Sequence, residues 1–259
     1  MESITSKFFE GIYEDNISMD ESTDSFYLSG IEDASSLSIG GVFVMDFQKR
    51  CLPVVSHRDI FLCGHPFEQA AQSGYDFFRE TVYADDLPLF IKIHRTILKS
   101  EYIIDEEQQS QIKYFYFTIR VKDHPQLYSK SNYLMLCHKI KPVFIKGKIR
   151  YGLCFITISR MLTPGNLRVY FNNRKAEEYS FNINTWIKYE TEPLNDKEIE
   201  ILRLAKRGFK EHEIADQLYI TYGRLRNIIS NIYQKLDVHT IEQAVIHASN
   251  HLMLFNSKQ

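Results

Sequence analysis

The chain has 259 residues, of which 44% are hydrophobic and 25% are charged, a composition that excludes a wholly disordered or fibrous protein. At about 150 residues per domain, this length favours two domains. Lys and Arg number 31 and Asp and Glu 33, so the net charge of −2 excludes binding of polyanions through overall positive charge. Any contact with nucleic acid must come from a local surface.

The chain shows no sign of a membrane or secretory segment. No run of about 18 apolar residues occurs, and residues 1–12 contain Lys7 and Glu10 where a signal peptide would have an apolar core. The cysteines form no CxxC pair and no metal-binding spacing, so we expect reduced structural thiols at Cys51, Cys63, Cys137 and Cys154. The sequence therefore predicts a cytoplasmic protein that binds neither a metal nor a membrane.

Residues 1–36 are expected to form a frayed or helical lead-in. From residue 37 to residue 160, β-branched and aromatic runs alternate with apolar patterns of helical period. The expected strands are 41–47, 52–56, 113–121, 133–145 and 150–158. Short helical pieces are expected at 66–80 and a longer helix at 85–99. This order predicts an α+β domain.

The order of these elements resembles that of a PAS domain. The run from Val82 to Leu87 is similar to the segment that precedes a helix in this family, although Tyr83 and Ala84 stand where His-Pro is usual. The resemblance implies a sensor domain at 37–160 that binds a small-molecule ligand or mediates dimerisation. Residues 161–189 are expected to form a connector, which contains the only tryptophan, Trp186.

The expected sensor region offers little for catalysis or for a cofactor. Isolated histidines are more often structural than haem ligands; those in this region are His57, His65, His94, His124 and His138. No Ser-His-Asp order, glycine-rich phosphate loop or pair of carboxylates stands out. We therefore expect no enzyme activity and no cofactor. A redox sensor that binds a cofactor is the weakest of the three functional hypotheses, after the two that are given at the end of this section.

Residues 190–259 carry the strongest helical pattern. Asn195 followed by Glu198 predicts a capping box at the start of a first helix, and Gly208 predicts its end. A short helix at 211–218, a turn at 219–221 and a longer helix at 222–236 follow. A fourth helix is striped by Ile241, Ala244, Val245, Ala248, Leu252 and Phe255.

The third of these helices has two different faces. Its apolar stripe consists of Leu225, Ile228, Ile229, Ile232 and Leu236. The opposite face carries amide, hydroxyl and guanidinium groups, which can donate to base edges and phosphates: Arg224, Arg226, Asn227, Ser230, Asn231 and Gln234. Residues 221–236 contain three basic residues and no acidic residue. A short helix, a turn and a polar-faced helix form the layout of a helix-turn-helix.

Residues 193–248 resemble the LuxR-type DNA-binding domain, an all-α, four-helix helix-turn-helix of bacterial regulators. The resemblance rests on many ordered matches, among them Glu213-Ile214-Ala215, Leu225-Arg226-Asn227 and Gln243-Ala244-Val245. It implies that Arg226, Asn227 and Ser230 face the groove of double-stranded DNA, and that Thr221 and Lys235 meet phosphates. Here Ile228 stands where the family often has histidine, and Gly223-Arg224 replaces the usual Lys-Thr.

Two other domains often precede this type of helix-turn-helix. A phosphoacceptor receiver needs alternating β and α units, whereas residues 110–160 are strand after strand. A sensor of acyl-homoserine lactones typically carries a Trp-Tyr-Asp signature, whereas Trp186 is followed by Ile187. Neither pattern is present, which favours the PAS-like domain.

The sequence therefore predicts a one-component transcription regulator with a PAS-like sensor and a LuxR-type DNA-binding domain at 190–259. Counted from Glu190, nine basic residues stand against ten acidic ones. Because the basic surface is only local, affinity per monomer should be modest and the protein should bind as a homodimer. The alternative is a protein-interaction or scaffold protein whose helical domain does not bind DNA.

Overall fold

The computed structural model describes residues 3–12, 21–38, 40–56, 61–122, 132–159, 161, 163–173, 175–189, 194–236 and 238–250, with residues 21–24 and 250 described by their backbone alone. The chain forms two compact units. Residues 1–158 and 162–189 are called the sheet unit here, and residues 159–161 and 190–259 the helical unit. In the described ranges, no helix is long and apolar enough to cross a membrane.

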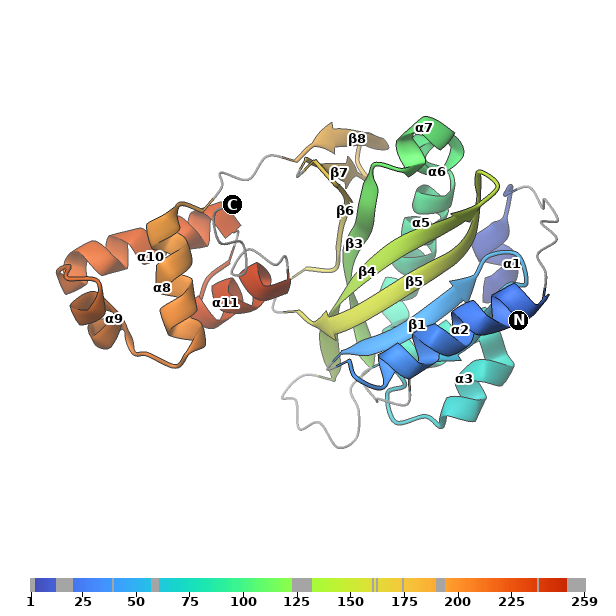
Figure 1. Ribbon diagram of the computed structural model, residues 1–259, viewed down its shortest axis with the longest axis horizontal. Helices are drawn as coiled ribbons and strands as arrows, with labels where there is room; N and C mark the ends of the chain where they lie inside the picture. Colours follow the sequence, from blue (N-terminus) through green and yellow to red (C-terminus); the bar gives the residue numbers. More distant parts are fainter. Residues whose placement is uncertain are drawn as a thin grey trace. The chain divides into compact units, whose positions relative to one another are not determined.

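The sheet unit is built on one eight-stranded sheet with the order β2-β1-β5-β4-β3-β6-β7-β8 (Figure 1). Its strands are β1 (Gly41–Asp46), β2 (Cys51–Val55), β3 (Ile112–Lys122), β4 (Tyr133–Ile145), β5 (Lys148–Ile158), β6 (Gly165–Phe171), β7 (Ala176–Ser180) and β8 (Thr185–Lys188). Every neighbouring pair is antiparallel. The five strands expected from the sequence are confirmed.

The sheet extends beyond the boundary expected at residue 160. β6 pairs with β3, with Phe115 opposite Val169, and β7 and β8 continue the sheet from there. Residues 165–188 thus form three strands of the sheet unit, whereas the sequence predicted a connector at 161–189. The physical reason lies at β3, whose outer edge would be open without β6, and in Leu167 and Val169, which are buried in the core.

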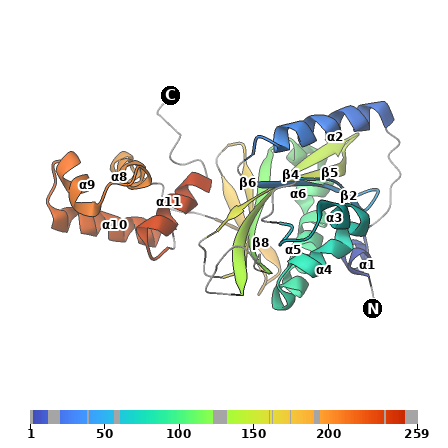
Figure 2. The same ribbon diagram turned by 90° about the horizontal axis from the view of Figure 1, so that it is seen from below.

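Helices cover both faces of the sheet (Figure 2). They are α1 (Ile4–Phe9), α2 (Glu21–Ser35), α3 (Phe67–Ser73), α4 (Phe78–Thr81), α5 (Leu87–Leu98), α6 (Glu101–Ile104) and α7 (Glu106–Gln109), with the 3₁₀ turns η1 (Gly74–Phe77) and η2 (Ala84–Asp86). α2 lies on one face, where Tyr27 packs near Val44 and Tyr151. α1, α3, α4 and α5 lie on the other face.

The helix α1, within the expected lead-in, is part of the core of the sheet unit. Ile4 and Phe8 of α1 are buried, and the side chain of Asp76 accepts hydrogen bonds from the hydroxyl of Ser3 (2.8 Å) and the amide of Ile4 (2.7 Å). Phe8 packs against Phe78 and Phe90. The first helix is therefore held by long-range contacts, which a local pattern does not reveal.

The helical unit consists of α8 (Asp196–Lys206), α9 (Glu211–Gln217), α10 (Tyr222–Leu236) and α11 (Ile241–Asn250). Its core is mostly aliphatic: Ile201, Leu202, Leu204, Ile214, Ala215, Leu225, Ile229, Ile232, Leu236, Val238, Ala244 and Ala248. The predicted capping box is present, because Asn195 accepts from the amide of Glu198 (2.9 Å) and Glu198 accepts from the amide of Asn195 (2.8 Å). Leu252 and Phe255, expected in the fourth helix, lie outside the described residues.

Candidate nucleic-acid interface

The turn between α9 and α10 is closed by backbone hydrogen bonds. The amide of Tyr219 donates to the carbonyl of Asp216 (3.1 Å), and the amide of Ile220 donates to that of Ala215 (3.0 Å). This is the pattern of a Schellman motif, with Tyr219 in the left-handed conformation (φ 51°) where glycine is usual. Gly208 ends α8 in the same way, with φ 91°. The two turns fix the directions of α9 and α10.

α10 starts at a hydroxyl cap. Thr221 Oγ1 accepts a hydrogen bond from the amide of Arg224 at 3.3 Å. A capping threonine satisfies one of the amides that the first turn of a helix leaves open. Thr221 is exposed, so its hydroxyl proton can still be donated outward.

The apolar stripe of α10 faces the core as the sequence predicted. Leu225, Ile229, Ile232 and Leu236 are buried, and Ile228 is half-buried against the same cluster. The opposite side is exposed: Thr221, Arg224, Arg226, Asn227, Ser230, Asn231 and Gln234. The fold thus brings seven of the eight predicted site residues to the exposed side of one helix.

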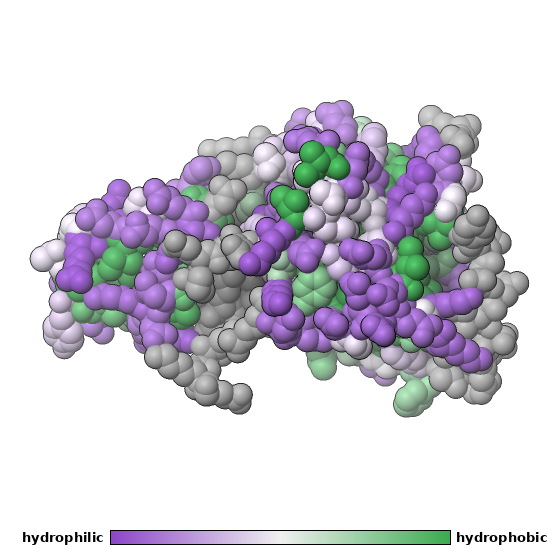
Figure 3. Space-filling model, turned by 90° about the horizontal axis from the view of Figure 1, so that it is seen from above, coloured by the Kyte–Doolittle hydropathy of each residue, from purple (hydrophilic) through white to green (hydrophobic). Residues whose placement is uncertain are grey.

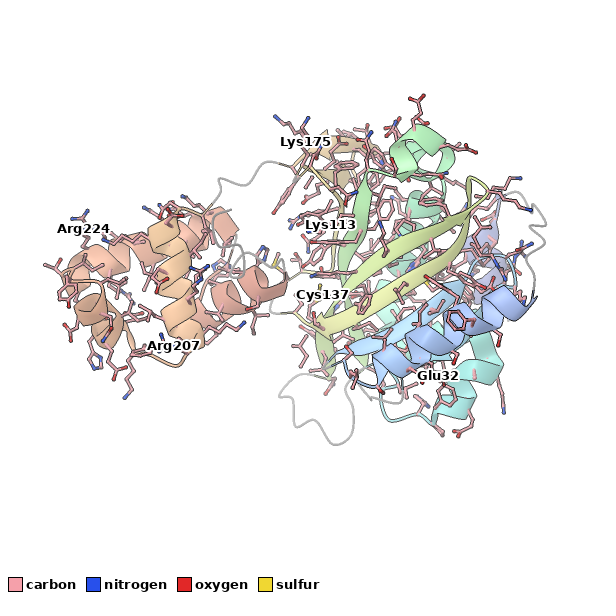
Figure 4. All side chains as sticks on the ribbon, viewed as in Figure 1. Glu32, Lys113, Cys137, Lys175, Arg207 and Arg224 are labelled. Carbon is pink, nitrogen blue, oxygen red and sulfur yellow. The ribbon has the colours of Figure 1, made fainter. Side chains whose placement is uncertain are left out.

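The surface of the helical unit is mostly hydrophilic where it is visible in Figure 3, on the left of the view. Figure 4 shows Arg224 projecting into solvent from the first part of α10. No acidic residue occurs on α10 itself. A polar helix of this kind, with its back buried, has the dimensions and the donors that suit the major groove of DNA.

Arg226 has a carboxylate partner that the sequence pattern did not reveal. Its Nη1 donates to both oxygens of Glu211, at 3.2 and 3.3 Å, and the hydroxyl of Tyr222 donates to the same carboxylate at 2.8 Å. Glu211 is the first residue of α9 and lies eleven positions before Tyr222 in the sequence. The hydrogen bond to Glu211 raises the pKa of the Tyr222 hydroxyl.

Lys235 lies in a different environment from the other predicted site residues. Its ammonium is 3.0 Å from Glu198 Oε2, and the two side chains are 17% and 3% exposed. Glu198 also closes the capping box of α8. Lys235 therefore compensates a buried carboxylate, a role that the sequence did not predict for it.

In the described part of the chain, no group of three or more His, Cys, Asp or Glu side chains lies close enough to hold a metal ion. His94 and His138 are buried among phenylalanines of the sheet unit. His65 is half-buried, with Nδ1 at 3.1 Å from Gln69 Oε1. His57 and His124 lie outside the described residues.

A groove runs along α5 of the sheet unit and was not foreseen from the sequence. Its volume is about 730 Å³. Its lining combines basic and aromatic side chains, among them Lys92, Arg95, Lys99, Tyr179 and Trp186. The aromatic residues come from β7 and β8, so the groove exists only because these strands extend the sheet.

Comparison with known proteins identifies the family of the helical unit. Residues 192–248 match the model of bacterial regulatory proteins of the luxR family. The response regulator protein VraR of Staphylococcus aureus (strain NCTC 8325 / PS 47) is 40% identical over 63 residues, which are 24% of this chain and 30% of VraR. VraR of Staphylococcus epidermidis matches with the same values, 40% over 63 residues. This chain thus spans about 30% of the length of these curated relatives.

Two solved structures are similar over more of the chain. A dimer of Vibrio cholerae VqmA in the absence of target DNA is 15% identical, covers 86% of this chain and 87% of that chain, and has a TM-score of 0.32. VqmA bound to DPO is 13% identical, covers 89% of this chain and 90% of that chain, and also has a TM-score of 0.32. These scores are too low to establish a common fold for the whole chain.

The match of residues 192–248 to the luxR-family model shows that the helical unit carries a LuxR-type helix-turn-helix domain.

Proposed function

We propose that this chain is a sequence-specific DNA-binding transcription regulator of the one-component type. The observation that carries the proposal is the exposed polar side of α10, presented by a helix-turn-helix whose apolar side is buried. The luxR-family match over the same helices supports it. In this proposal α10 enters the major groove.

The exposed side chains of α10 divide by reach and chemistry. Arg226, Asn227 and Ser230 read base edges, Arg224, Asn231 and Gln234 flank them, and Thr221 donates to a phosphate. Lys235 neutralises the buried carboxylate of Glu198, so we assign it a structural role before a DNA-binding one. DNA is bound by a homodimer, whose two α10 helices would lie about 34–36 Å apart, one turn of the duplex.

The sheet unit is proposed to be a PAS-like sensor. Its first five strands have the order β2-β1-β5-β4-β3, with α3, α4 and α5 between β2 and β3 in the chain. This order is typical of PAS domains, and the antiparallel pairs differ from the parallel sheet of a phosphoacceptor receiver. A ligand or partner at this unit would bias dimer geometry or the exposure of α10 in a two-state equilibrium. The protein would act in the cytoplasm, and we propose no enzyme activity and no cofactor.

The groove along α5 supports binding of a small molecule by the sheet unit. The core beneath the sheet is filled by aromatic rings such as Phe78, Phe90 and Phe117, whereas the groove is open to solvent. Trp186, the only tryptophan of the chain, lines it. Tryptophan fluorescence therefore reports directly on whether a candidate ligand occupies the groove.

The test is selection of duplexes from a random pool by the purified full-length protein, followed by a salt titration of the enriched duplex. A roughly palindromic motif with a steep salt slope is expected. Enrichment only by residues 190–259, which contain their own hydrophobic core, would mean that the sheet unit holds the DNA-binding domain inactive. No enrichment by either would overturn the proposal in favour of a protein-interaction function.

Arg226→Ala is the sharpest variant for this test. It should abolish sequence-specific binding while the circular dichroism spectrum stays unchanged, because the side chain is exposed. Arg207→Ala is the matched control, since Arg207 is an exposed arginine beyond the end of α8 (Figure 4). Equal losses in the two variants would contradict the role of Arg226.

A further inference from the structure

Glu211 is the carboxylate that the fold adds to an interface whose own helix has none. It belongs to α9, yet it contacts two exposed residues of α10, Tyr222 and Arg226. These two lie four positions apart and therefore on the same side of α10. The side chain of Glu211 is 27% exposed and that of Arg226 is 60% exposed, so the pair sits at the surface and within reach of a ligand.

The geometry leaves most of the guanidinium of Arg226 free. Glu211 takes hydrogen bonds from Nη1 alone, whereas an arginine has five N–H donors. A guanine base accepts two donors, at N7 and O6. Arg226 can therefore keep its contact with Glu211 and still donate from the rest of its guanidinium to a base.

The same contact weakens attraction to phosphates. Non-specific binding depends on the number of phosphate charges that the protein neutralises. A carboxylate 3.2 Å from Arg226 cancels its charge at long range, although it leaves the hydrogen-bond donors in place. Glu211 thus opposes backbone binding and orients the residue that reads bases.

We propose that Glu211 is a specificity-determining residue of the DNA interface. It is a positioning residue, which holds Arg226 for base contacts while lowering affinity for DNA of any sequence. The proposal rests on the proposed function of the helical unit. It differs from a purely structural role of Glu211 at the start of α9, which would affect folding and leave the ratio of specific to non-specific affinity unchanged.

The experiment compares the full-length protein with its Glu211→Gln variant on two duplexes, the one enriched by selection and a random-sequence one of equal length. For the random duplex, one more effective phosphate contact should steepen the salt slope by about 0.9 and raise affinity about eightfold at 0.1 M salt. Affinity for the enriched duplex should rise less, so the specificity ratio falls. Circular dichroism verifies the fold.

Asp216→Asn is the matched control, because Asp216 is an exposed acid on the same helix α9. It should change both affinities by the same small factor. Tyr222→Phe removes one hydrogen bond to Glu211 but keeps both charges, and it should lower the specificity ratio without changing the salt slope. In an Arg226→Ala background, Glu211→Gln should have no larger effect than Asp216→Asn.

The outcomes distinguish failure of the proposed role of Glu211 from failure of the proposed DNA-binding function. Specific binding by the wild type with an unchanged specificity ratio and salt slope in Glu211→Gln overturns the role of Glu211 alone. Absence of DNA binding by the wild type and by every variant overturns the proposed function, and the role of Glu211 with it. A lower non-specific affinity in Glu211→Gln would also contradict the proposal, since its sign is opposite.

Discussion

The two units of this protein are stabilised by different kinds of buried side chains. The sheet unit buries large rings together with ionisable groups, including Asp46, Arg150, His94 and His138. The buried members of the core cluster of the helical unit are all aliphatic, and the partly buried rings of Phe209 and Tyr233 pack against them. The polar interactions of this unit lie mostly at helix ends, such as the capping box at Asn195. The helical unit also buries one carboxylate, Glu198, which pairs with Lys235. The comparison therefore teaches that charge and pH should act mainly on the sheet unit, whereas the helical unit depends more on local helix signals.

The largest expected loss of stability comes from a substitution in the sheet unit. Asp46 and Arg150 form an ion pair in which both side chains are 2% exposed. Asp46→Ala leaves a buried arginine without this partner, which should lower the free energy of unfolding by about 3–5 kcal/mol. Urea unfolding followed by Trp186 fluorescence measures this, because the only tryptophan belongs to β8.

A paired replacement is the control for this variant. Asp46→Leu combined with Arg150→Met removes both charges together, and it should cost less than Asp46→Ala alone. Equal or greater loss in the double variant would show that shape at this site matters more than charge, and would weaken the contrast between the two units.

The second effect is a pH dependence of the sheet unit. Burial lowers the pKa of His94 to about 4 and that of His138 to about 3, from 6.5. The unfolded chain therefore binds protons that the folded chain does not. Stability is full above pH 6.5 and falls as the pH drops toward 4, by about 1.4 kcal/mol per pH unit for each histidine.

Urea unfolding at pH 7 and pH 5, again read by Trp186, tests this dependence. His138→Phe keeps an aromatic ring beside Phe117 and should reduce the slope. His212→Gln is the control, because it changes a histidine of the helical unit whereas Trp186 reports on the sheet unit. A slope that does not respond to His138→Phe would mean that other groups carry the pH dependence.

The third prediction concerns the contribution of helix caps to the stability of the helical unit. Asn195→Ala removes the side chain that accepts from the amide of Glu198 and should lower stability by about 1 kcal/mol. Helical circular dichroism follows the loss, while Trp186 fluorescence of the sheet unit should not change. Asp105→Ala, which removes the cap of the four-residue helix α7, should have a smaller effect because that end is exposed.

The fourth effect has opposite signs at two equivalent positions. Gly208 and Tyr219 both have a left-handed backbone at the end of a helix. Tyr219→Gly should stabilise the helical unit by about 1 kcal/mol, because non-glycine residues are strained there. Gly208→Ala should destabilise it by a similar amount. Thermal unfolding of the two variants gives both signs, and a destabilised Tyr219→Gly would mean that the exposed ring makes contacts of its own.

The sequence predicted the helical unit well because its information is local. The apolar period of α10, the cap at Asn195 and the stop at Gly208 each involve residues within a few positions of one another. The exposed side of α10 follows from the same period. Helix-turn-helix geometry could therefore be predicted, together with seven residues of its exposed side.

The sheet unit was predicted only in part. The five strands from β1 to β5 can be predicted from local patterns. Their pairing in the sheet cannot, because it joins strands that are distant in the sequence: β1 pairs with β5, and β6 with β3. The role of residues 165–188 depends on the open edge of β3, which no pattern within those residues describes. The place of α1 in the core likewise depends on distant rings such as Phe78 and Phe90.

The sequence by itself determined the helices of the helical unit, strands β1 to β5 of the sheet unit and which side chains α10 exposes, because periodicity and caps act between near neighbours. Only the tertiary structure decided the partners of charged groups. It paired Arg226 with Glu211, Lys235 with Glu198 and Arg150 with Asp46. Each of these pairs joins different elements of the fold, and an ion pair forms wherever packing brings opposite charges within a few ångströms.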